Sequence, residues 1–362
     1  MALSLEKWGN DLHSGKRSYP IVPHRRRWFL VSALLMALSI GLLFGRGFTL
    51  GIDFKGGSQF DVSGVTNADT QPAVDAIASV DATAVPTVKA LTDLDGVVTI
   101  NVQMQSLDDK EASAVVTALA AAYDVNAQDS ISANVIGPTW GSEVSSKAIK
   151  ALIIFLVLVT LVMALYFRAW RMAVAALIAL AHDLLFTVGV YAGIGFEVTP
   201  ATVIGFLTIL GFSLYDTVVV FDKVRENTAE FQSQKRYTYA ELANLAVNQT
   251  LVRSINTSIV ALLPVVSILF IGSYALRADT LKDISLALFV GLAVGTYSSI
   301  FVATPFEVAL RSREKTVKAH TAEVIAARTA QGIDPSVPAP VVTVAPGSHQ
   351  GVAAQPRRKG RS

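Results

Sequence analysis

The chain has 362 residues, of which 52% are hydrophobic and only 16% are charged, and its mean hydropathy is +0.49. In soluble domains about a quarter of all residues are charged, so this composition favours a membrane protein. There is no cysteine, which excludes disulfides, thiolate metal sites and cysteine nucleophiles. Neither a GxxxxGKS/T phosphate loop nor an HExxH pair occurs, so we expect no enzyme, no metal and no other cofactor.

Six apolar runs are long enough to cross a bilayer, for which roughly 20 residues suffice. They lie near residues 27–45, 149–167, 172–195, 200–221, 254–273 and 284–306. Three arginines precede the first run and no small-residue cleavage site follows it, which indicates a retained anchor after an N-terminal arm of residues 1–26. Of the 30 Lys and Arg, 22 lie in residues 1–27, the second and fourth loops and the tail, so the positive-inside rule predicts both termini in the cytoplasm.

The segment 47–147, between the first two runs, is predicted to be a soluble external domain. It carries 13 Asp and Glu against 4 Lys and Arg and contains no apolar run of membrane length. Alternating patterns predict strands over 57–64, 84–91, 96–103 and 132–137. Helical spacing follows an N-cap at Asp69 or Thr70, and again over 106–125, where Ser106 is the expected opening residue. The order β-α-β-β-α-β predicts a small ferredoxin-like α+β domain.

The tail, residues 311–362, is rich in Pro and Ala and ends in the basic sequence QPRRKGRS. Such a composition cannot bury enough apolar surface to order itself, so we expect a disordered cytoplasmic tail after a short helix through 314–330. Its basic end could contact anionic lipid or ribosomal RNA, although composition favours a solvated segment.

Four ionisable residues fall within the predicted spans or at their edges: His182, Asp183, Asp216 and Arg253. A charge at the bilayer centre costs about 2.5–3.5 kcal/mol on insertion scales, so such residues normally face a bundle interior or a cavity. A helical rise of about 1.5 Å per residue places Asp183 near mid-bilayer and Asp216 roughly 9 Å from the inner boundary. Because Arg253 opens the fifth span at that boundary, it can meet Asp216 if their helices are neighbours.

A carboxylate in this setting can load and release a proton as its surroundings change. The alternative is a permanent Asp216–Arg253 ion pair that only fixes the packing of helices. The same two interpretations apply to His182 and Asp183. They can take part in proton transfer, or the histidine can simply form a hydrogen bond to a neighbouring helix. Polar residues extend the pattern near both members of the pair: Ser213, Thr217, Asn256, Thr257 and Ser258.

Four stretches together resemble SecF of the SecD/SecF family, a membrane component of the bacterial protein translocase that is related to the RND transporters. They are GIDFKGG after the first span, GFSLYDTVVVFDKVREN in the fourth, NQTLVRSINTS entering the fifth and VGLAVGTYSSIFVATP in the sixth. The resemblance covers residues 20 to 310. Within the sixth span, Gly291 and Gly295 form a GxxxG spacing that allows close helix packing.

The resemblance implies a multi-pass protein of the bacterial cytoplasmic membrane that uses the proton motive force to promote late steps of preprotein translocation. Its implied partners are a SecD-like subunit, the Sec channel and its motor, the translocating preprotein, membrane lipid and protons. The family's functional Asp and Arg fall on Asp216 and Arg253, and its His-Asp pair falls on His182 and Asp183. Where the family usually has Asn before the aspartate, this chain has Tyr215, whose hydroxyl lies at a different distance.

Two other functions remain open from the residues. One is an RND-type proton-coupled exporter of a lipid or small molecule, although such exporters usually have twelve spans and a second large external loop. The other is a scaffold that holds translocase partners together without transducing energy.

Overall fold

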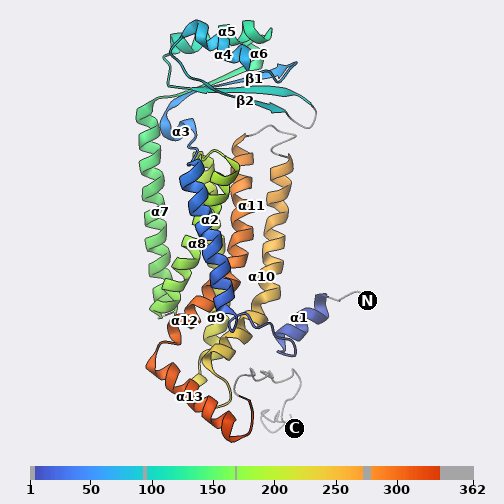
Figure 1. The fold of residues 1–362 in the computed structure, drawn as a ribbon, viewed down its shortest axis with the longest axis vertical. Coiled ribbons are helices and arrows are strands. Elements are labelled where there is room, and N and C mark those ends of the chain that lie inside the picture. Colours follow the sequence, from blue (N-terminus) through green and yellow to red (C-terminus); the bar gives the residue numbers. More distant parts are fainter. Residues whose placement is uncertain (1–4, 93–95, 168, 272–278, 335–362) are drawn as a thin grey trace, which may run out of the picture.

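A computed structural model describes residues 5–92, 96–167, 169–271 and 279–334 as a long helical bundle with a small sheet domain at one end (Figure 1). The helices long and apolar enough to span a membrane number six in this described part, and they confirm the predicted class. They are α2 (Arg25–Arg46), α7 (Pro138–Phe167), α8 (Trp170–Ile194), α9 (Pro200–Thr228), α10 (Tyr239–Phe270) and a sixth that is made of three elements. These three are α11 (Asp279–Ser298), the π-helix η3 (Ser299–Ala303) and α12 (Thr304–Arg311).

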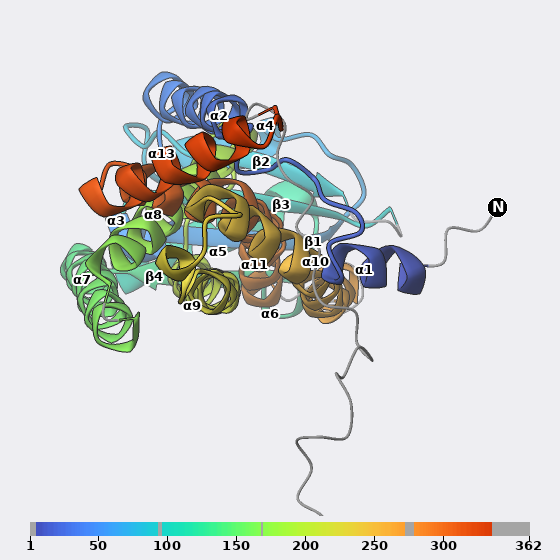
Figure 2. The ribbon, with the colours of Figure 1, turned by 90° about the horizontal axis from the view of Figure 1, so that it is seen from below.

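Burial differs strongly between the spans. Helix α11 lies in the middle of the bundle, in contact with α8, α9 and α10 (Figure 2). Over half of the sixth span's apolar window is buried, whereas α2 and α7 bury only 11% of theirs. The outer helices therefore expose apolar side chains all along their length, as expected for contact with lipid.

Several spans are longer than predicted. Helix α10 begins at Tyr239, 15 residues before the predicted fifth span, and α9 continues to Thr228. The extra turns are amphipathic or polar, so apolar content alone did not include them. Thr238 opens α10 with a capping box, in which its hydroxyl and the Glu241 carboxylate each accept a bond from the other's backbone N–H.

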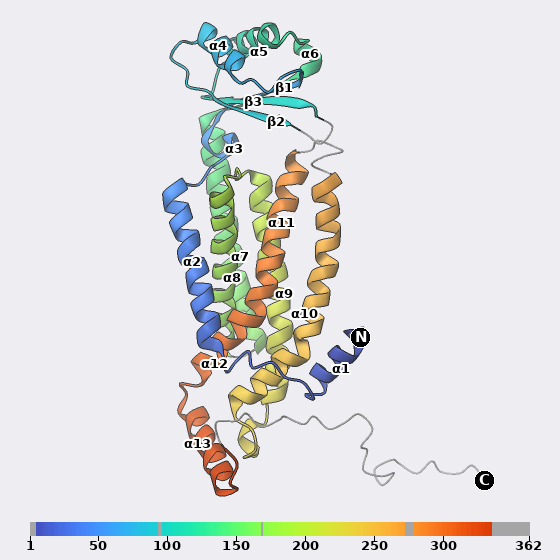
Figure 3. The same ribbon diagram turned by 45° about the vertical axis from the view of Figure 1, so that its right-hand side comes forward.

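The sheet domain spans residues 57–136 and has the predicted element order. Strands β1 (Gly57–Val65), β2 (Thr87–Thr92), β3 (Val98–Met104) and β4 (Ile131–Ile136) form an antiparallel sheet in the order β2-β3-β1-β4. Helices α4 (Gln71–Val80) and α5 (Asp109–Tyr123) cover the face that points away from the bundle (Figure 3). Alternate residues such as Phe60, Val62 and Ile100 fill the core beneath these helices. The short helices α3 (Ile52–Lys55) and α6 (Ala127–Ser130) precede β1 and β4.

The expected opening of the second domain helix at Ser106 is wrong by two residues. The N-cap of α5 is Asp108, whose carboxylate accepts from the backbone N–H groups of Lys110 and Glu111. Glu111 in turn accepts from the Asp108 N–H, which completes a capping box. In the first domain helix the N-cap is Thr70, one of the two residues expected there, and it makes no side-chain capping bond.

The N-terminal arm packs on the N-terminal half of α10. It includes α1 (Leu5–His13) and a segment whose backbone is held by two asparagines. Asn248 accepts from the Tyr19 N–H at 2.7 Å, and Asn244 accepts from the Val22 N–H at 3.0 Å. Both asparagine side chains also donate to the Tyr19 carbonyl, so the arm has a fixed path.

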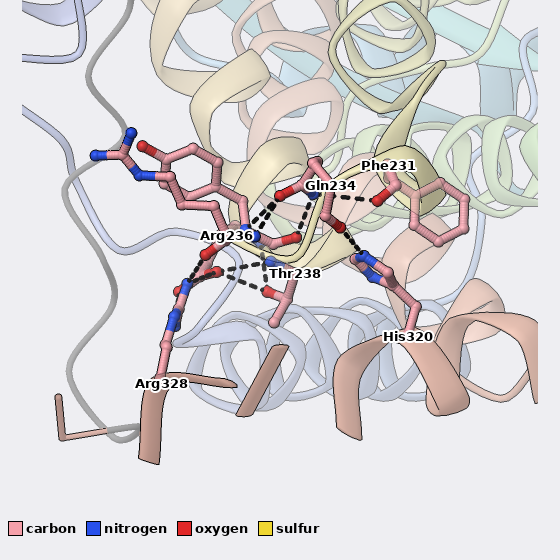
Figure 4. A network of polar contacts seen from close by, with 8 residues as sticks. Phe231, Gln234, Arg236, Thr238, His320 and Arg328 are labelled. Carbon is pink, nitrogen blue, oxygen red and sulfur yellow. Dashed lines mark hydrogen bonds and ion pairs between the residues drawn. The ribbon is translucent and has the colours of Figure 1, made fainter. Parts of the chain in front are cut away.

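Residues 315–330 form the helix α13 (Lys315–Ala330), which agrees with the short helix expected through 314–330. The expected disordered tail falls mostly on residues 335–362, which lie outside the described part. Helix α13 covers the turn before α10 (Figure 4). Arg328, only 5% exposed, donates to both carboxylate oxygens of Glu241 at 2.7 and 2.9 Å and to the Arg236 carbonyl. The His320 Nε2 lies 2.7 Å from the Gln234 carbonyl oxygen. These contacts hold the expected helix against the turn before α10.

The GxxxG spacing in α11 gives the close helix packing that it predicts, and the partner helix is α9. A Cβ on Gly291 would lie 2.2–2.5 Å from three side-chain atoms of Ile209, and one on Gly295 would lie 3.1 Å from the Ser213 Cβ. The glycines therefore allow these two helices to approach closely.

We expect Gly291→Ala to lower the free energy of unfolding by about 1–3 kcal/mol, because Ile209 is buried and the added methyl overpacks the contact. The measurement is thermal or denaturant unfolding of the purified protein in detergent. Gly211→Ala in α9 is the matched control, since nothing lies within 4 Å of its Cβ position. Equal stability of the two variants would contradict the close packing.

Candidate functional site

Asp183 lies in the middle of α8 and is fully buried. One of its oxygens accepts hydrogen bonds from Ser213 of α9 and from Ser298 at the end of α11, the latter at 2.8 Å. The other oxygen lies 3.2 Å from the His182 Nδ1. Three helices therefore meet at this carboxylate.

Asp216 of α9 is the second buried aspartate, with 4% of its surface exposed. Its Oδ1 accepts from Ser254 of α10 at 2.7 Å, and its Oδ2 accepts from Ser299, the first residue of η3. The two aspartates thus have the same kind of environment, in which each is held by serine hydroxyls from two neighbouring helices.

Adjacent serines of the sixth span serve different carboxylates. Ser298 ends the α-helical part and Ser299 begins the π-helix, where the bonding changes from i→i+4 to i→i+5. Short π-helical segments are rare and often occur at functional sites. Here the change of helical pitch lies at the two residues that bind Asp183 and Asp216.

His182 is buried beside Asp183, which its Nδ1 faces. Its Nε2 is buried with no partner among the described residues. The ring packs near those of Phe186 and Tyr297, at centroid distances of 6.3 and 6.1 Å.

Arg253 does not pair with Asp216 in this structure. It is exposed, whereas its neighbour Ser254 faces the carboxylate. The depth estimate from the sequence places both residues correctly at one level, since Ser254 reaches Asp216. It carries no information on the direction in which each side chain points. Among the described residues no hydrogen bond or ion pair joins Arg253 to Asp216.

The other predicted polar residues divide by the face on which they lie. Ser213 and Thr217 are buried, and the Thr217 hydroxyl has no partner among the described residues. Tyr215 is 53% exposed, and Asn256 is exposed while Thr257 is half-buried. Tyr215 makes no hydrogen bond to either aspartate, whose described partners are serines and His182.

Three carboxylate donors were missed from the sequence: Ser254, Ser298 and Ser299. Their position in the stretches around Arg253 and after GTY could have indicated them, but serine in a membrane helix commonly bonds to its own backbone. Ser258 does so, with a bond to the Ser254 carbonyl at 2.9 Å, while its hydroxyl also accepts from Thr296. Only the contacts between helices in the structure distinguish a serine that binds an aspartate from one that bonds only to its own helix.

The arrangement suits proton binding. Within the described ranges no group of three His, Asp or Glu could hold a metal ion. Serine hydroxyls both donate and accept, so each can remain bonded to an aspartate whether or not that aspartate carries a proton. Two buried carboxylates on adjacent helices with such partners are typical of proton relays in membrane transporters.

Comparison with known proteins identifies the family. A family described as protein export membrane protein SecD/SecF, C-terminal, matches residues 115–313, and the SecD/SecF GG motif matches residues 41–66. The chain belongs to the SecD/SecF family. The matched parts include the five candidate membrane spans after the sheet domain and the GIDFKGG stretch before it.

Curated SecF proteins are similar over most of their length. The protein translocase subunit SecF of Streptomyces coelicolor is 46% identical over 327 residues, which cover 90% of this chain and 85% of that protein. The SecF of Mycobacterium leprae is 42% identical over 88% of this chain and 70% of its own length. The crystal structure of SecDF from Thermus thermophilus, a translocon-associated membrane protein, superimposes with a TM-score of 0.69 at 30% identity. That match covers 83% of this chain, which spans 39% of the longer SecDF chain.

We expect the double substitution Ser254→Ala/Ser299→Ala to lower the free energy of unfolding by about 1–3 kcal/mol, because it leaves the buried Asp216 unsatisfied. The measurement is unfolding in detergent at neutral pH. Ser285→Ala is the control: Ser285 is equally buried, but its hydroxyl bonds to the carbonyls of its own helix. An equal loss in control and double variant would contradict a special role of the two hydroxyls.

Proposed function

We propose that this chain is a SecF subunit that uses the proton motive force to promote late steps of preprotein translocation across the bacterial cytoplasmic membrane. The observation that carries the proposal is the pair of buried carboxylates, Asp183 and Asp216, each held by serines of neighbouring helices. A purely structural protein has no need of two such costly groups at this depth. His182 and Arg253 are the further proton-coupling residues.

Protons would bind in turn to these carboxylates as the helices shift. Because each serine donor comes from a different helix from its aspartate, a change in charge on the aspartate alters the bonds that hold two helices together. Protonation removes one acceptor site and weakens the charge-assisted bonds that the carboxylate receives. Proton binding is thereby converted into a change of helix packing.

The exposed position of Arg253 supports a partner subunit on α10. Around it, α10 also exposes Asn256 and apolar residues, including Val260, 65% exposed, and Leu263, 62% exposed. A guanidinium at the level of Asp216 that faced only lipid would be expensive, so it needs a carboxylate or a polar surface from another chain. The SecDF relatives carry SecD and SecF in one chain, and we propose that a separate SecD-like subunit covers this face here.

The basic arm and loops support an orientation with both termini in the cytoplasm and the acidic sheet domain outside. There the domain can meet the preprotein as it leaves the Sec channel. The channel, its motor and the membrane lipid complete the set of proposed partners.

We expect Asp216→Asn to abolish the part of preprotein export that depends on the proton gradient, because an amide cannot bind and release a proton at this site. The measurement is export into membrane vesicles with and without a protonophore, at matched protein levels. Asp222→Asn, six residues further along α9 at an exposed position, is the control and should export normally. Unimpaired, gradient-dependent export by Asp216→Asn would remove this residue from the mechanism.

A photoreactive amino acid placed at Val260 of α10 should crosslink to the SecD-like subunit in the assembled complex. The same amino acid at Ile153 of α7, which is 55% exposed, should crosslink to lipid only. Crosslinking of SecD from α7 and not from α10, detected by mass of the adduct, would place the partner on the other side of the bundle.

A further inference from the structure

The loop between α8 and α9, residues 195–199, bonds to three separate parts of the molecule through three consecutive residues. Glu197 reaches the sheet domain. Val198 pairs with the segment before α3, where its N–H donates to the Thr49 carbonyl at 2.8 Å and its carbonyl accepts from Gly51 at 2.9 Å. Thr199 donates to the Asp283 carboxylate in the first turns of α11 at 2.9 Å. This loop is also the direct link between the helices that carry Asp183 and Asp216.

Glu197 binds the face of the sheet that points toward the membrane. One carboxylate oxygen accepts from the Lys89 Nζ of β2 at 2.8 Å, and the other accepts from the Gln103 Nε2 of β3 at 3.0 Å. Gln103 is itself positioned by Gln59 of β1, whose carbonyl oxygen accepts from it at 3.2 Å. A single side chain of the membrane part thus contacts two strands, and a third strand supports the contact.

The sheet domain is joined to the bundle at two places by the chain itself. The chain enters through α3 into β1 and leaves from β4 into α7, and these two strands are neighbours in the sheet (Figure 3). Lys89 lies on β2, the edge strand at the opposite side of the sheet from β4. Glu197 therefore adds a non-covalent contact to strands β2 and β3, beyond the two strands through which the chain enters and leaves.

The contact is of a kind that can open. The side chains of Lys89 and Glu197 are 44% and 23% exposed, and ion pairs accessible to water contribute little net stability. Burial raises the pKa of Glu197, but the hydrogen bonds from Lys89 and Gln103, with the charges of Lys89 and Lys282 of α11, outweigh it and hold the pKa below its ordinary value. A lowered pKa means that the contact is intact above the ordinary carboxyl range and is lost only in acid.

We propose that Glu197 is a releasable latch, through which proton binding in the helices α8 and α9 moves the sheet domain during each export cycle. The proposal rests on the proposed function, since it gives the proton-driven change of helix packing a route to the external domain. Glu197 is a positioning residue in this scheme and does not itself carry the transported proton.

Exchange of charge at the ion pair gives a direct test in the assembled complex. Glu197→Lys places a second positive charge beside Lys89, so we expect it to lose gradient-dependent export into vesicles. Lys89→Glu/Glu197→Lys restores a pair of opposite charges at the same two positions and should regain that export. The control is Glu143→Lys, which breaks the exposed Lys147–Glu143 pair of α7 and should export normally. Full export by Glu197→Lys, or no recovery in the double variant, would overturn the latch.

A second readout separates the latch from a purely structural contact. Asn101→Cys, two residues before Gln103 on the same face of β3, introduces a single buried cysteine into this chain and leaves Lys89, Gln103 and Glu197 in place. It should be alkylated faster when a proton gradient is present, because the sheet face becomes accessible when the latch opens. In an Asp216→Asn background the rate should not respond to the gradient. An alkylation rate unaffected by the gradient in active complexes would contradict the latch alone. Normal export by Asp216→Asn would contradict the proposed function, and the charge-exchange result would then decide the latch.

Discussion

The hydrogen bonds between serine hydroxyls and two buried aspartates determine how the bundle is built. A carboxylate within the membrane has to find its solvation in the protein, because the lipid offers none. Asp183 takes it from α9 and the end of α11, and Asp216 takes it from α10 and η3. The central position of the sixth span follows from this requirement, since that span is the one that supplies a hydroxyl to both. The glycines that let α11 approach α9 also help to position these donors, because Gly295 lies directly against Ser213, which binds Asp183.

Much of this architecture could be predicted from the sequence. Long apolar runs located the six spans, and strand alternation located all four strands of the sheet domain. The constant rise of a helix placed Asp216 and the start of the fifth span at one level. The direction in which a side chain points around the helix axis could not be predicted in the same way. Successive residues of a helix differ by about 100° in direction, and a span with few charged residues does not show which of its faces is turned to the bundle interior. Arg253 and Ser254 are neighbours in sequence, and only Ser254 turns toward the carboxylate.

The N-cap of α5 differs from its prediction for a local reason. Ser106 and Asp108 are both good N-caps by residue type, and the chain uses Asp108, which has Glu111 three residues later to complete the box. The helix of residues 315–330, which the sequence does predict, is held by partners more than seventy residues away, among them Glu241, and composition cannot reveal those partners. Tyr215, next to Asp216 in sequence, lies on the outer face of α9 with 53% of its surface exposed.

The asparagines that hold the N-terminal arm also constrain how the protein is made. The bonds from Asn244 and Asn248 to the segment around Tyr19 join residues 222–229 positions apart. Synthesis proceeds at about 5–20 residues per second, so roughly 10–45 seconds separate the appearance of the arm from that of its binding site. During that interval the first helix is already inserted while its flanking segment has nowhere to dock. The arm can therefore reach its native contacts only after the first part of the fifth span has left the ribosome, so docking of the arm is a late step of assembly.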